Sequence, residues 1–179
     1  MAAEVYKNEP SVLKGCGVKN FMSYAEIPVN HNETLYSSGI VRNGDISKLF
    51  EINEDLITEE ATHSWYQNDK ALHPYEGDTT PNYTGFVDAD TIGPDGTPIK
   101  TKALNLEGKY SWIKSPRYNG EPMEVGPLAA IVVGLAAKNP RITKIATQFL
   151  KDTGLPIEAL FTTLGRTAAR LLECKLSAD

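Results

Sequence analysis

Residues 109–129 read KYSWIKSPRYNGEPMEVGPLA, and this stretch joins a loop-rich half of the chain to an apolar helix. Its three prolines each fix φ and disfavour helix in the preceding residue, which pushes Ser115, Glu121 and Gly126 towards extended or turn geometry. The sequence therefore predicts an ordered, non-repetitive loop. A loop this rich in rings and charges keeps one shape by packing on something else, and such loops often carry sites.

The composition is that of a globular protein without a nucleic-acid surface. Of the 179 residues, 41% are apolar and 23% are charged, which excludes disorder as the main interpretation. This length suits one domain or part of a larger one. The 18 Lys and Arg residues are scattered and the net charge is -5, which argues against a surface that neutralises phosphates. Small molecules or proteins are the expected partners.

Targeting and cysteine signals are sparse. Residues 1–10 lack the basic and apolar regions of a secretory signal. The longest apolar run, Pro127 to Ala137, would form ~16 Å of helix against a hydrocarbon core of ~30 Å, so no transmembrane segment is expected. Cys16 and Cys174 form no Cys-x-x-Cys pair and are too few for a disulfide framework or a self-contained zinc or iron–sulfur site. Cys16 is interpreted as a small buried residue.

Strand signals dominate the first fifty residues. Phe21, Met22 and Tyr24 are typical of a buried strand or sheet edge. Residues 40–46, IVRNGDI, predict a hairpin closed by a type I′ turn, because Asn43 and Gly44 both tolerate the positive φ that this turn requires. We expect Leu49-Phe50-Glu51-Ile52 to extend or follow that sheet.

The next segment carries an acidic cluster and a histidine. The acidic cluster is most simply a solvated face at a helix N-terminus; its members are Glu54, Asp55, Glu59 and Glu60. His63 precedes Trp65 and Tyr66. A lone histidine beside two rings is usually a packed, hydrogen-bonded residue, although histidine is also the side chain best suited to tune proton or electron sites near neutral pH. From the residues alone we favour the packed interpretation.

Residues 67–108 are rich in loop signals. The Pro94-Asp95-Gly96 turn, flanked by residues 91–92 and 99–100, predicts a small hairpin. A loop region of this length is unusual in a compact domain unless it covers a partner or a site.

Three apolar stripes at helical spacing follow. The first begins at Pro127, a favourable first helical position, and ends before Asn139-Pro140. The second covers residues 142–150, with Gly154 as the expected C-terminal cap. The third covers residues 160–172, where Gly165 is expected to allow close helix packing. Arg166 and Arg170 lie on its other side, which predicts a solvated face, or else contact with a larger interface.

These signals predict an α+β fold. Its β/loop-rich half, residues 1–108, begins with a β-hairpin and is followed by a helical half, residues 109–179, and together they form one incomplete domain. The apolar face of the third helix runs almost to Asp179, and such a face needs a partner. We therefore expect the chain to be part of a larger protein.

Several ordered motifs together resemble the large subunit of NiFe hydrogenases. The longest is the stretch 109–129 itself. Five others occur in the same order as in that family: Asn20-Phe21-Met22-Ser23-Tyr24, Glu60-Ala61-Thr62-His63-Ser64-Trp65-Tyr66, His73-Pro74-Tyr75-Glu76-Gly77, Pro81-Asn82-Tyr83-Thr84, and Thr163-Leu164-Gly165-Arg166-Thr167-Ala168-Ala169-Arg170. The resemblance covers nearly the whole chain and places it in the middle of a longer subunit.

The resemblance implies reversible oxidation of dihydrogen to protons and electrons. In the family, a Ni-Fe(CN)2CO centre is held by two Cys-x-x-Cys pairs, because soft thiolates suit these metals, and electrons leave through an iron–sulfur small subunit. The implied partners are that small subunit and the remainder of the large subunit. The implied location is periplasmic or membrane-associated through the small subunit, with the cytoplasm as the alternative.

Both cysteine pairs of the family are missing from this chain, and neither Cys16 nor Cys174 matches them in context. The isolated chain is therefore expected to be inactive and to hold no cofactor, and no catalytic or metal-ligating residue is assigned. His63 is the one site residue carried over, since it resembles a family histidine facing the proximal iron–sulfur cluster of the small subunit. Arg117, Glu121 and Glu124 are interpreted as structural.

Two functional interpretations remain. The first is part of a hydrogenase large subunit, and the second is a stand-alone structural or protein-binding module derived from that family. An independent hydrolase or transferase has little support, because the sequence contains no nucleophile motif, phosphate-binding glycine loop or metal-ligand cluster.

Overall fold

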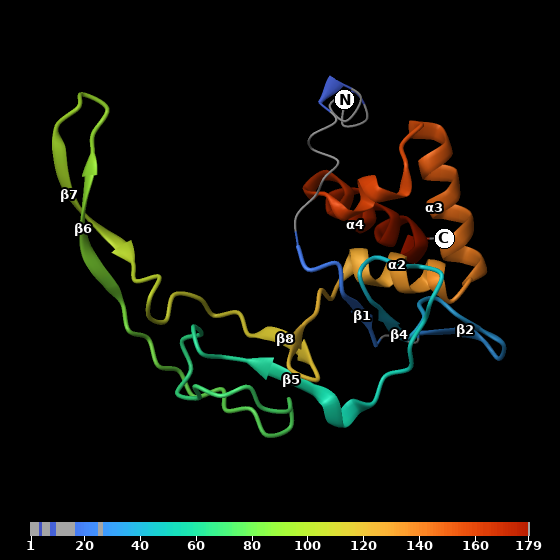
Figure 1. Ribbon diagram of the computed structural model, residues 1–179, viewed down its shortest axis with the longest axis horizontal. Coiled ribbons are helices and arrows are strands. Elements are labelled where there is room, and N and C mark those ends of the chain that lie inside the picture. Colours follow the sequence, from blue (N-terminus) through green and yellow to red (C-terminus); the bar gives the residue numbers. More distant parts are fainter. Residues whose placement is uncertain (1–3, 5–7, 10–16, 25–26, 179) are drawn as a thin grey trace. The chain divides into compact units, whose positions relative to one another are not determined.

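The computed structural model describes residues 4, 8–9, 17–24 and 27–178. The chain divides into two compact units (Figure 1). The first combines residues Met1–Asn53 with Pro122–Asp179, and the second is the intervening segment Glu54–Glu121. Strands and loops fill most of the chain before residue 122 and helices follow it, so the predicted α+β class is confirmed.

The helices of the first unit begin and end where local signals place them. They are α2 (Pro127–Ala136), α3 (Pro140–Thr153), the short 3-10 helix η3 (Ile157–Phe161) and α4 (Thr163–Ala178). Pro127 opens α2, and the Asn139 side chain accepts hydrogen bonds from two backbone N–H groups in the first turn of α3. Gly154 ends α3 at φ 65°, a left-handed conformation that glycine adopts without cost. The predicted start at Pro127 and the predicted cap at Gly154 are confirmed. The third predicted helix, residues 160–172, is divided, because Leu160 and Phe161 belong to η3 and α4 begins at Thr163.

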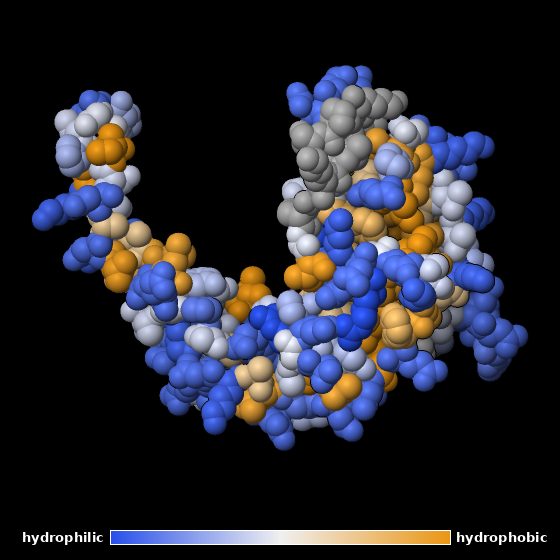
Figure 2. Space-filling model, in the orientation of Figure 1, coloured by the Kyte–Doolittle hydropathy of each residue, from blue (hydrophilic) through white to orange (hydrophobic). Residues whose placement is uncertain are grey.

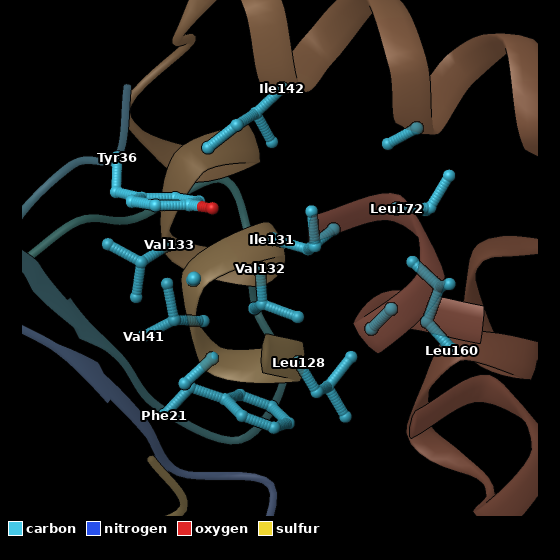
Figure 3. Packing of buried hydrophobic residues seen from close by; sticks show 14 of the residues in the cluster. Phe21, Tyr36, Val41, Leu128, Ile131, Val132, Val133, Ile142, Leu160 and Leu172 are labelled. Atoms are coloured by element: carbon cyan, nitrogen blue, oxygen red, sulfur yellow. The ribbon is translucent and has the colours of Figure 1, made fainter. Parts of the chain in front are cut away.

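Helix α2 is the centre of this unit rather than a one-sided surface helix. All residues from Leu128 to Gly134 are buried, so the apolar character goes around the helix instead of forming a single stripe. Figure 3 shows Phe21 and Val41 on one side of α2 and Leu160 and Leu172 on the other. Strands, α3 and α4 therefore share one core built around α2.

Gly165 lets α4 approach the preceding 3-10 helix closely. A Cβ at this position would lie 2.1 Å from the carbonyl oxygen of Ala159 and 2.4 Å from that of Leu160. The backbone N–H of Gly165 donates to Thr162 Oγ1 at 3.1 Å, which caps the start of the helix. The predicted close packing at Gly165 is confirmed.

The strands of this unit pair differently from the predicted hairpin at residues 40–46. β1 (Phe21–Ser23) pairs antiparallel with β4 (Gly39–Val41), and both strands are buried. The turn itself forms, with Asn43 at φ 55°, Gly44 at φ 71° and a hydrogen bond from Asp45 N to Arg42 O, but the residues after it are not a strand. The hairpin prediction is therefore wrong, because the partner of β4 lies earlier in the chain.

The predictions for Phe50 and for Tyr24, on either side of this strand pair, have different outcomes. Phe50 forms a bridge with Ile40 and so continues the sheet as expected, whereas Tyr24 is 56% exposed and lies outside the buried strand. A second small antiparallel pair joins β2 (Pro28–Asn30) to β3 (Glu33–Thr34).

The second unit is built on a sheet that includes part of the stretch 109–129. It contains the 3-10 helix η2 (Glu54–Leu56) and the strand order β5 (Ile57–Glu60), β8 (Ser115–Tyr118), β9 (Glu121–Pro122). Asn119 at φ 50° and Gly120 at φ 79° connect β8 to β9. The stretch 109–129 is thus not a purely non-repetitive loop, although Ser115 and Glu121 do adopt the extended backbone that the following prolines favour.

The acidic cluster also divides between two elements. Glu54 and Asp55 lie in the first turn of η2, as expected for acidic residues near a helix N-terminus. Glu59 and Glu60 lie on β5 instead, so the helical prediction is wrong for them.

The predicted hairpin around Pro94-Asp95-Gly96 is confirmed and is longer than expected. β6 (Phe86–Ile92) pairs in regular antiparallel register with β7 (Pro98–Leu104), from Phe86 opposite Leu104 to Ile92 opposite Pro98. Most of its residues are exposed on both faces, and both apolar and charged side chains occur along it (Figure 2). Asp88 and Lys102 form a cross-strand ion pair.

Candidate functional site

His63 lies in the second unit, where its ring is exposed and held in one orientation. Its Nδ1 lies 2.7 Å from the carbonyl oxygen of Gly108. Because a carbonyl can only accept, Nδ1 carries the proton and Nε2 is the basic nitrogen of the neutral ring. The imidazole also stacks on the ring of Tyr110, with centroids 5.1 Å apart. The hydrogen-bonded environment predicted for His63 is therefore present, but the residue is at the surface rather than packed inside.

Two segments far apart in sequence hold this arrangement together. The residues around His63 run beside residues 108–113, with a parallel bridge between Ser64 and Ser111. Backbone bonds join Tyr110 N to His63 O at 2.9 Å and Trp65 N to Ser111 O at 2.8 Å. The buried Ser64 hydroxyl donates to Ile113 O. Both segments are extended here, so the side chains of alternate residues lie on the same face of each segment.

The rings of these segments form two groups. His63 and Tyr110 stack on each other, and a second group, which we call the ring ladder, consists of Trp65, Trp112, Tyr83 and Phe86. Trp65 meets Trp112 edge-on at 5.1 Å and Tyr83 edge-on at 4.9 Å, geometries that the ring quadrupoles favour. Tyr83 reaches the row because its segment is bonded to Trp65 through Asn82 N to Trp65 O at 2.8 Å.

Trp65 is the buried member of the ring ladder. Its side chain is 8% exposed, and its indole Nε1 donates to Lys109 O at 2.7 Å. Its one polar group is therefore satisfied where it is removed from water. The rings are ordered by backbone hydrogen bonds on both sides rather than by a large apolar core.

Two lysines of the stretch 109–129 are largely buried beside the ring ladder and are paired within the chain. Lys109 lies 2.6 Å from Asp69, and Lys114 lies 3.3 Å from Glu59 and also over the ring of Tyr66 at 5.1 Å. Each lysine side chain is 12% exposed, but Asp69 is 70% and Glu59 37% exposed, so solvent screens the Lys109–Asp69 pair more than the Lys114–Glu59 pair. The positive charge of this stretch is thus compensated locally.

The three residues interpreted as structural occupy different places. Arg117 lies on β8 and donates to Ser115 Oγ at 2.7 Å, and Glu121 is exposed on β9. Glu124 lies in the first unit and accepts two hydrogen bonds from Arg166, from Nε at 2.7 Å and from Nη2 at 2.6 Å. Arg117 and Glu121 therefore belong to one unit and Glu124 to the other. The solvated face predicted for Arg166 is wrong, since its side chain is 26% exposed and tied to Glu124.

The residues that the structure describes do not provide a set of metal ligands. Among them, no three His, Cys, Asp or Glu side chains lie close enough together to hold a metal ion. Cys174 is exposed on α4, and Cys16 lies outside the described residues. A nickel–iron centre with thiolate ligands therefore does not fit the donor groups found here. Of the helices in the described ranges, none combines the length and apolar character needed to cross a membrane.

The ring ladder was not predicted from the sequence. The available signal was the repeated spacing of two residues, His63 to Trp65 and Tyr110 to Trp112, which puts side chains on one face of an extended segment. What the sequence could not show was that these two segments lie side by side.

Comparison with known proteins shows the family. The family model described as nickel-dependent hydrogenase matches residues 1–179. The quinone-reactive Ni/Fe-hydrogenase large chain of Wolinella succinogenes is 74% identical over 179 residues, which are 100% of this chain and 31% of that protein. The uptake hydrogenase large subunit of Bradyrhizobium diazoefficiens is 41% identical over 89% of this chain and 28% of its own length.

Solved structures agree with these relatives. A NiFeSe hydrogenase variant from Desulfovibrio vulgaris Hildenborough matches with a TM-score of 0.62 and 26% identity, over 99% of this chain and 34% of the solved one. The Dm. baculatum NiFeSe hydrogenase gives a TM-score of 0.58 at 23% identity and supports the fold alone. This chain spans about a third of the length of the curated relatives it matches. It belongs to the nickel-dependent hydrogenase family.

Proposed function

We propose that this chain is part of the large subunit of a nickel–iron hydrogenase, which oxidises dihydrogen reversibly to protons and electrons. The observation that carries the proposal is the 74% identity, along the whole chain, to a quinone-reactive Ni/Fe-hydrogenase large chain. Because the chain spans about a third of such proteins, the proposed activity belongs to the complete subunit. By the same identity, a quinone is the proposed final electron acceptor.

In this proposal the nickel–iron centre, which supplies the hydrogen chemistry, is held by cysteine pairs outside these 179 residues. The described residues offer no ligand set for it, so we assign none of them to a catalytic step. The chain instead contributes the core around α2 and the surface that carries the ring ladder. The isolated chain is accordingly proposed to be inactive.

His63 is proposed to face the proximal iron–sulfur cluster of the small subunit. Support comes from its exposure and from the two contacts that fix its ring, the hydrogen bond to Gly108 O and the stack on Tyr110. With the proton on Nδ1, the Nε2 atom is the one able to accept a hydrogen bond from a partner group. Through the small subunit, the proposed location is periplasmic or membrane-associated.

A stand-alone binding module is the second candidate, and the core of the first unit favours it. Helices α2, α3 and α4 bury one another together with β1 and β4, as an independently folding unit would require. In that case the 179-residue chain should unfold cooperatively as a monomer; the absence of nickel from this chain is expected of both candidates.

The test compares the 179-residue chain with the complete large subunit, each produced together with the small subunit and the maturation machinery. Nickel content and hydrogen-dependent reduction of a viologen dye are measured for both. The proposal expects about one nickel and dye reduction for the complete subunit only. Stoichiometric nickel on the 179-residue chain, or a complete subunit that binds nickel and does not use hydrogen, would contradict it.

A further inference from the structure

A pocket between α3 and α4 is lined by three cationic side chains. Its volume is about 400 Å³, and its lining residues are Arg141, Lys144, Ile145, Gln148, Lys175 and Leu176. Sites for small molecules span about 300–1,000 Å³, so the pocket is large enough for one. None of the lining residues that the structure describes is acidic. The pocket therefore carries three formal positive charges in a chain whose net charge is -5.

The two helices hold these cations around one space. Arg141 and Lys144 lie three residues apart on α3, a spacing that makes their side chains neighbours on the helix surface. Lys175 comes from the last turn of α4. Both helices contribute to the core around α2, so the walls of the pocket are fixed relative to each other. Ile145 and Leu176 add an apolar part to the lining.

The donors of the pocket are poorly satisfied within the chain. Nη2 of Arg141 lies 3.6 Å from Glu33 Oε2, and the two side chains are 38% and 42% exposed, so this pair contributes little. Nε of Arg141 is buried and finds no hydrogen-bond partner among the described residues. The ion pairs in the described part of the chain do not include Lys144. By contrast, Arg166 and the lysines beside the ring ladder are each paired with a carboxylate at a shorter distance.

The one acidic side chain bonded to a lining residue of α3 other than Arg141 does not compensate these charges. Asp152 accepts a hydrogen bond from Gln148 Nε2 at 2.6 Å and does not itself line the pocket. Three like charges that share one space repel one another, and an anion that enters the pocket offsets this repulsion.

The number of cations indicates which anion fits. A phosphate monoester carries a charge of about −1.5 to −2 at neutral pH and three acceptor oxygens, whereas a carboxylate carries one charge and two oxygens. Arginine binds phosphate through its fork of N–H donors, and lysine binds it as a point charge. The pocket also has many times the roughly 30 Å³ that one water molecule occupies, so an organic group can accompany the phosphate against Ile145 and Leu176.

We propose that the pocket between α3 and α4 binds the phosphate group of an organic phosphate monoester, with Arg141, Lys144 and Lys175 as its protein ligands. Two sources share this chemistry: a soluble phosphate ester, and the headgroup of a phospholipid that ends in a phosphomonoester. The site lies within the first unit and does not rest on the proposed function.

The test has one arm for each source. It uses the complete large subunit in its complex with the small subunit, so that the remainder of the protein is present around the pocket. Calorimetric titration with glycerol 3-phosphate measures the soluble source. Flotation with phosphatidylcholine vesicles that contain phosphatidic acid measures the lipid source, and vesicles of phosphatidylcholine alone are the blank.

Substitutions locate the binding. The double variant Lys144→Gln with Lys175→Gln should weaken binding by about tenfold or more, because a hydrogen bond to a charged group contributes about that factor. Both lysines are exposed, so their loss does not endanger folding. Lys144→Arg with Lys175→Arg, which keeps both charges, should retain most of the affinity.

The matched control is the double variant Lys151→Gln with Arg170→Gln. It removes one exposed cation from each of the same two helices, outside the pocket, and should bind as the unchanged protein does. The total charge of the protein is then equal in the two double variants, which separates a site from general attraction of anions.

The outcomes separate the sources and can refute the site. Glycerol 3-phosphate binding that only the pocket variant loses identifies a soluble ester, and vesicle binding that only this variant loses identifies a lipid headgroup. Absence of binding in both arms, equal losses in the two glutamine double variants, or acetate that binds as tightly as glycerol 3-phosphate would each overturn the proposal. The readout is binding rather than hydrogen oxidation, so this site and the proposed function fail separately.

Discussion

Replacing Arg166 by Ala should destabilise the first unit markedly. The guanidinium of Arg166 makes a two-pronged contact with Glu124, at 2.7 and 2.6 Å, and its Nη1 donates to Phe161 O at 2.8 Å. These bonds tie α4 to the segment that leads into α2. The fork geometry of arginine allows all of them at once, which a lysine at this position could not reproduce.

The expected magnitude follows from burial. The side chains of Arg166 and Glu124 are 26% and 19% exposed, between a surface pair worth about 0–1 kcal/mol and a buried pair whose rupture costs about 3–5 kcal/mol. We therefore expect Arg166→Ala to lower the free energy of unfolding by about 3 kcal/mol, with about 2 kcal/mol of coupling to Glu124. Lys48→Ala is the control, because the Lys48–Asp45 pair is exposed, and it should cost less than about 0.5 kcal/mol.

Urea denaturation of the 179-residue chain, followed by far-ultraviolet circular dichroism, measures these energies through the midpoint and slope. The double-mutant cycle uses Arg166→Ala, Glu124→Ala and both together. A coupling energy below about 0.5 kcal/mol, or an Arg166→Ala cost no larger than that of Lys48→Ala, would refute the assigned role of this pair.

Three further outcomes follow from local geometry. Gly165→Ala should cost about 2 kcal/mol or more in urea denaturation, because the new Cβ meets a backbone carbonyl oxygen at 2.1 Å, whereas Thr167→Ala on the exposed side of α4 should be nearly neutral. Asn139→Ala should cost about 2 kcal/mol or more, because it removes the cap of α3 and the bonds that Nδ2 donates to Thr34 O and Ser37 Oγ, and Asn139→Asp, which keeps the cap and loses both donors, should recover only part of that loss. Hydrogen bonds from Thr62 lower the pKa of Glu60 below 4.5, the value of an unperturbed glutamate, so Glu60 contributes stability above that pH, and the contribution is lost as pH falls through the lowered pKa. Thr62→Ala should raise the pKa of Glu60 towards 4.5 in an NMR titration and make unfolding less sensitive to pH below 4.5; an unchanged Glu60 titration would contradict this.

Local signals predicted local structure well. Pro127, Asn139 and Gly154 act within one helical turn, so the sequence contains nearly everything that fixes those helix ends. The turn at Pro94-Asp95-Gly96 likewise needs only adjacent residues, and its hairpin was predicted.

The pairing of segments that are distant in the chain could not be predicted from local sequence patterns. The turn at Asn43-Gly44 forms, yet β4 pairs with β1 because both strands are buried against α2, a choice made by packing rather than by the turn. In the stretch 109–129 the prolines disfavour helix, and Asn119-Gly120, a dipeptide that favours two-residue hairpin turns, joins β8 to β9. Arg166 shows the same limit, since its partner Glu124 lies 42 residues away.

The candidate site contains one feature that local sequence signals predict and one that depends on pairing between distant segments. His63 was singled out from its motif, and its anchoring by a hydrogen bond agrees with ordinary histidine chemistry. The ring ladder required the segments around Trp65 and Trp112 to lie together, which depends on backbone bonds that no local pattern specifies.

The two units differ in how they obtain their stability, and this difference bears on the function. The first unit has a continuous apolar core around α2. In the described part of residues 54–121, by contrast, the buried apolar side chains are Ala61, Trp65 and Tyr118, and order comes mainly from backbone bonds, ion pairs and ring contacts. A two-stranded hairpin such as β6–β7 is at best marginally stable without a packing partner. A unit with so little core, yet with three half-exposed rings in fixed positions, gains most when another protein surface covers it.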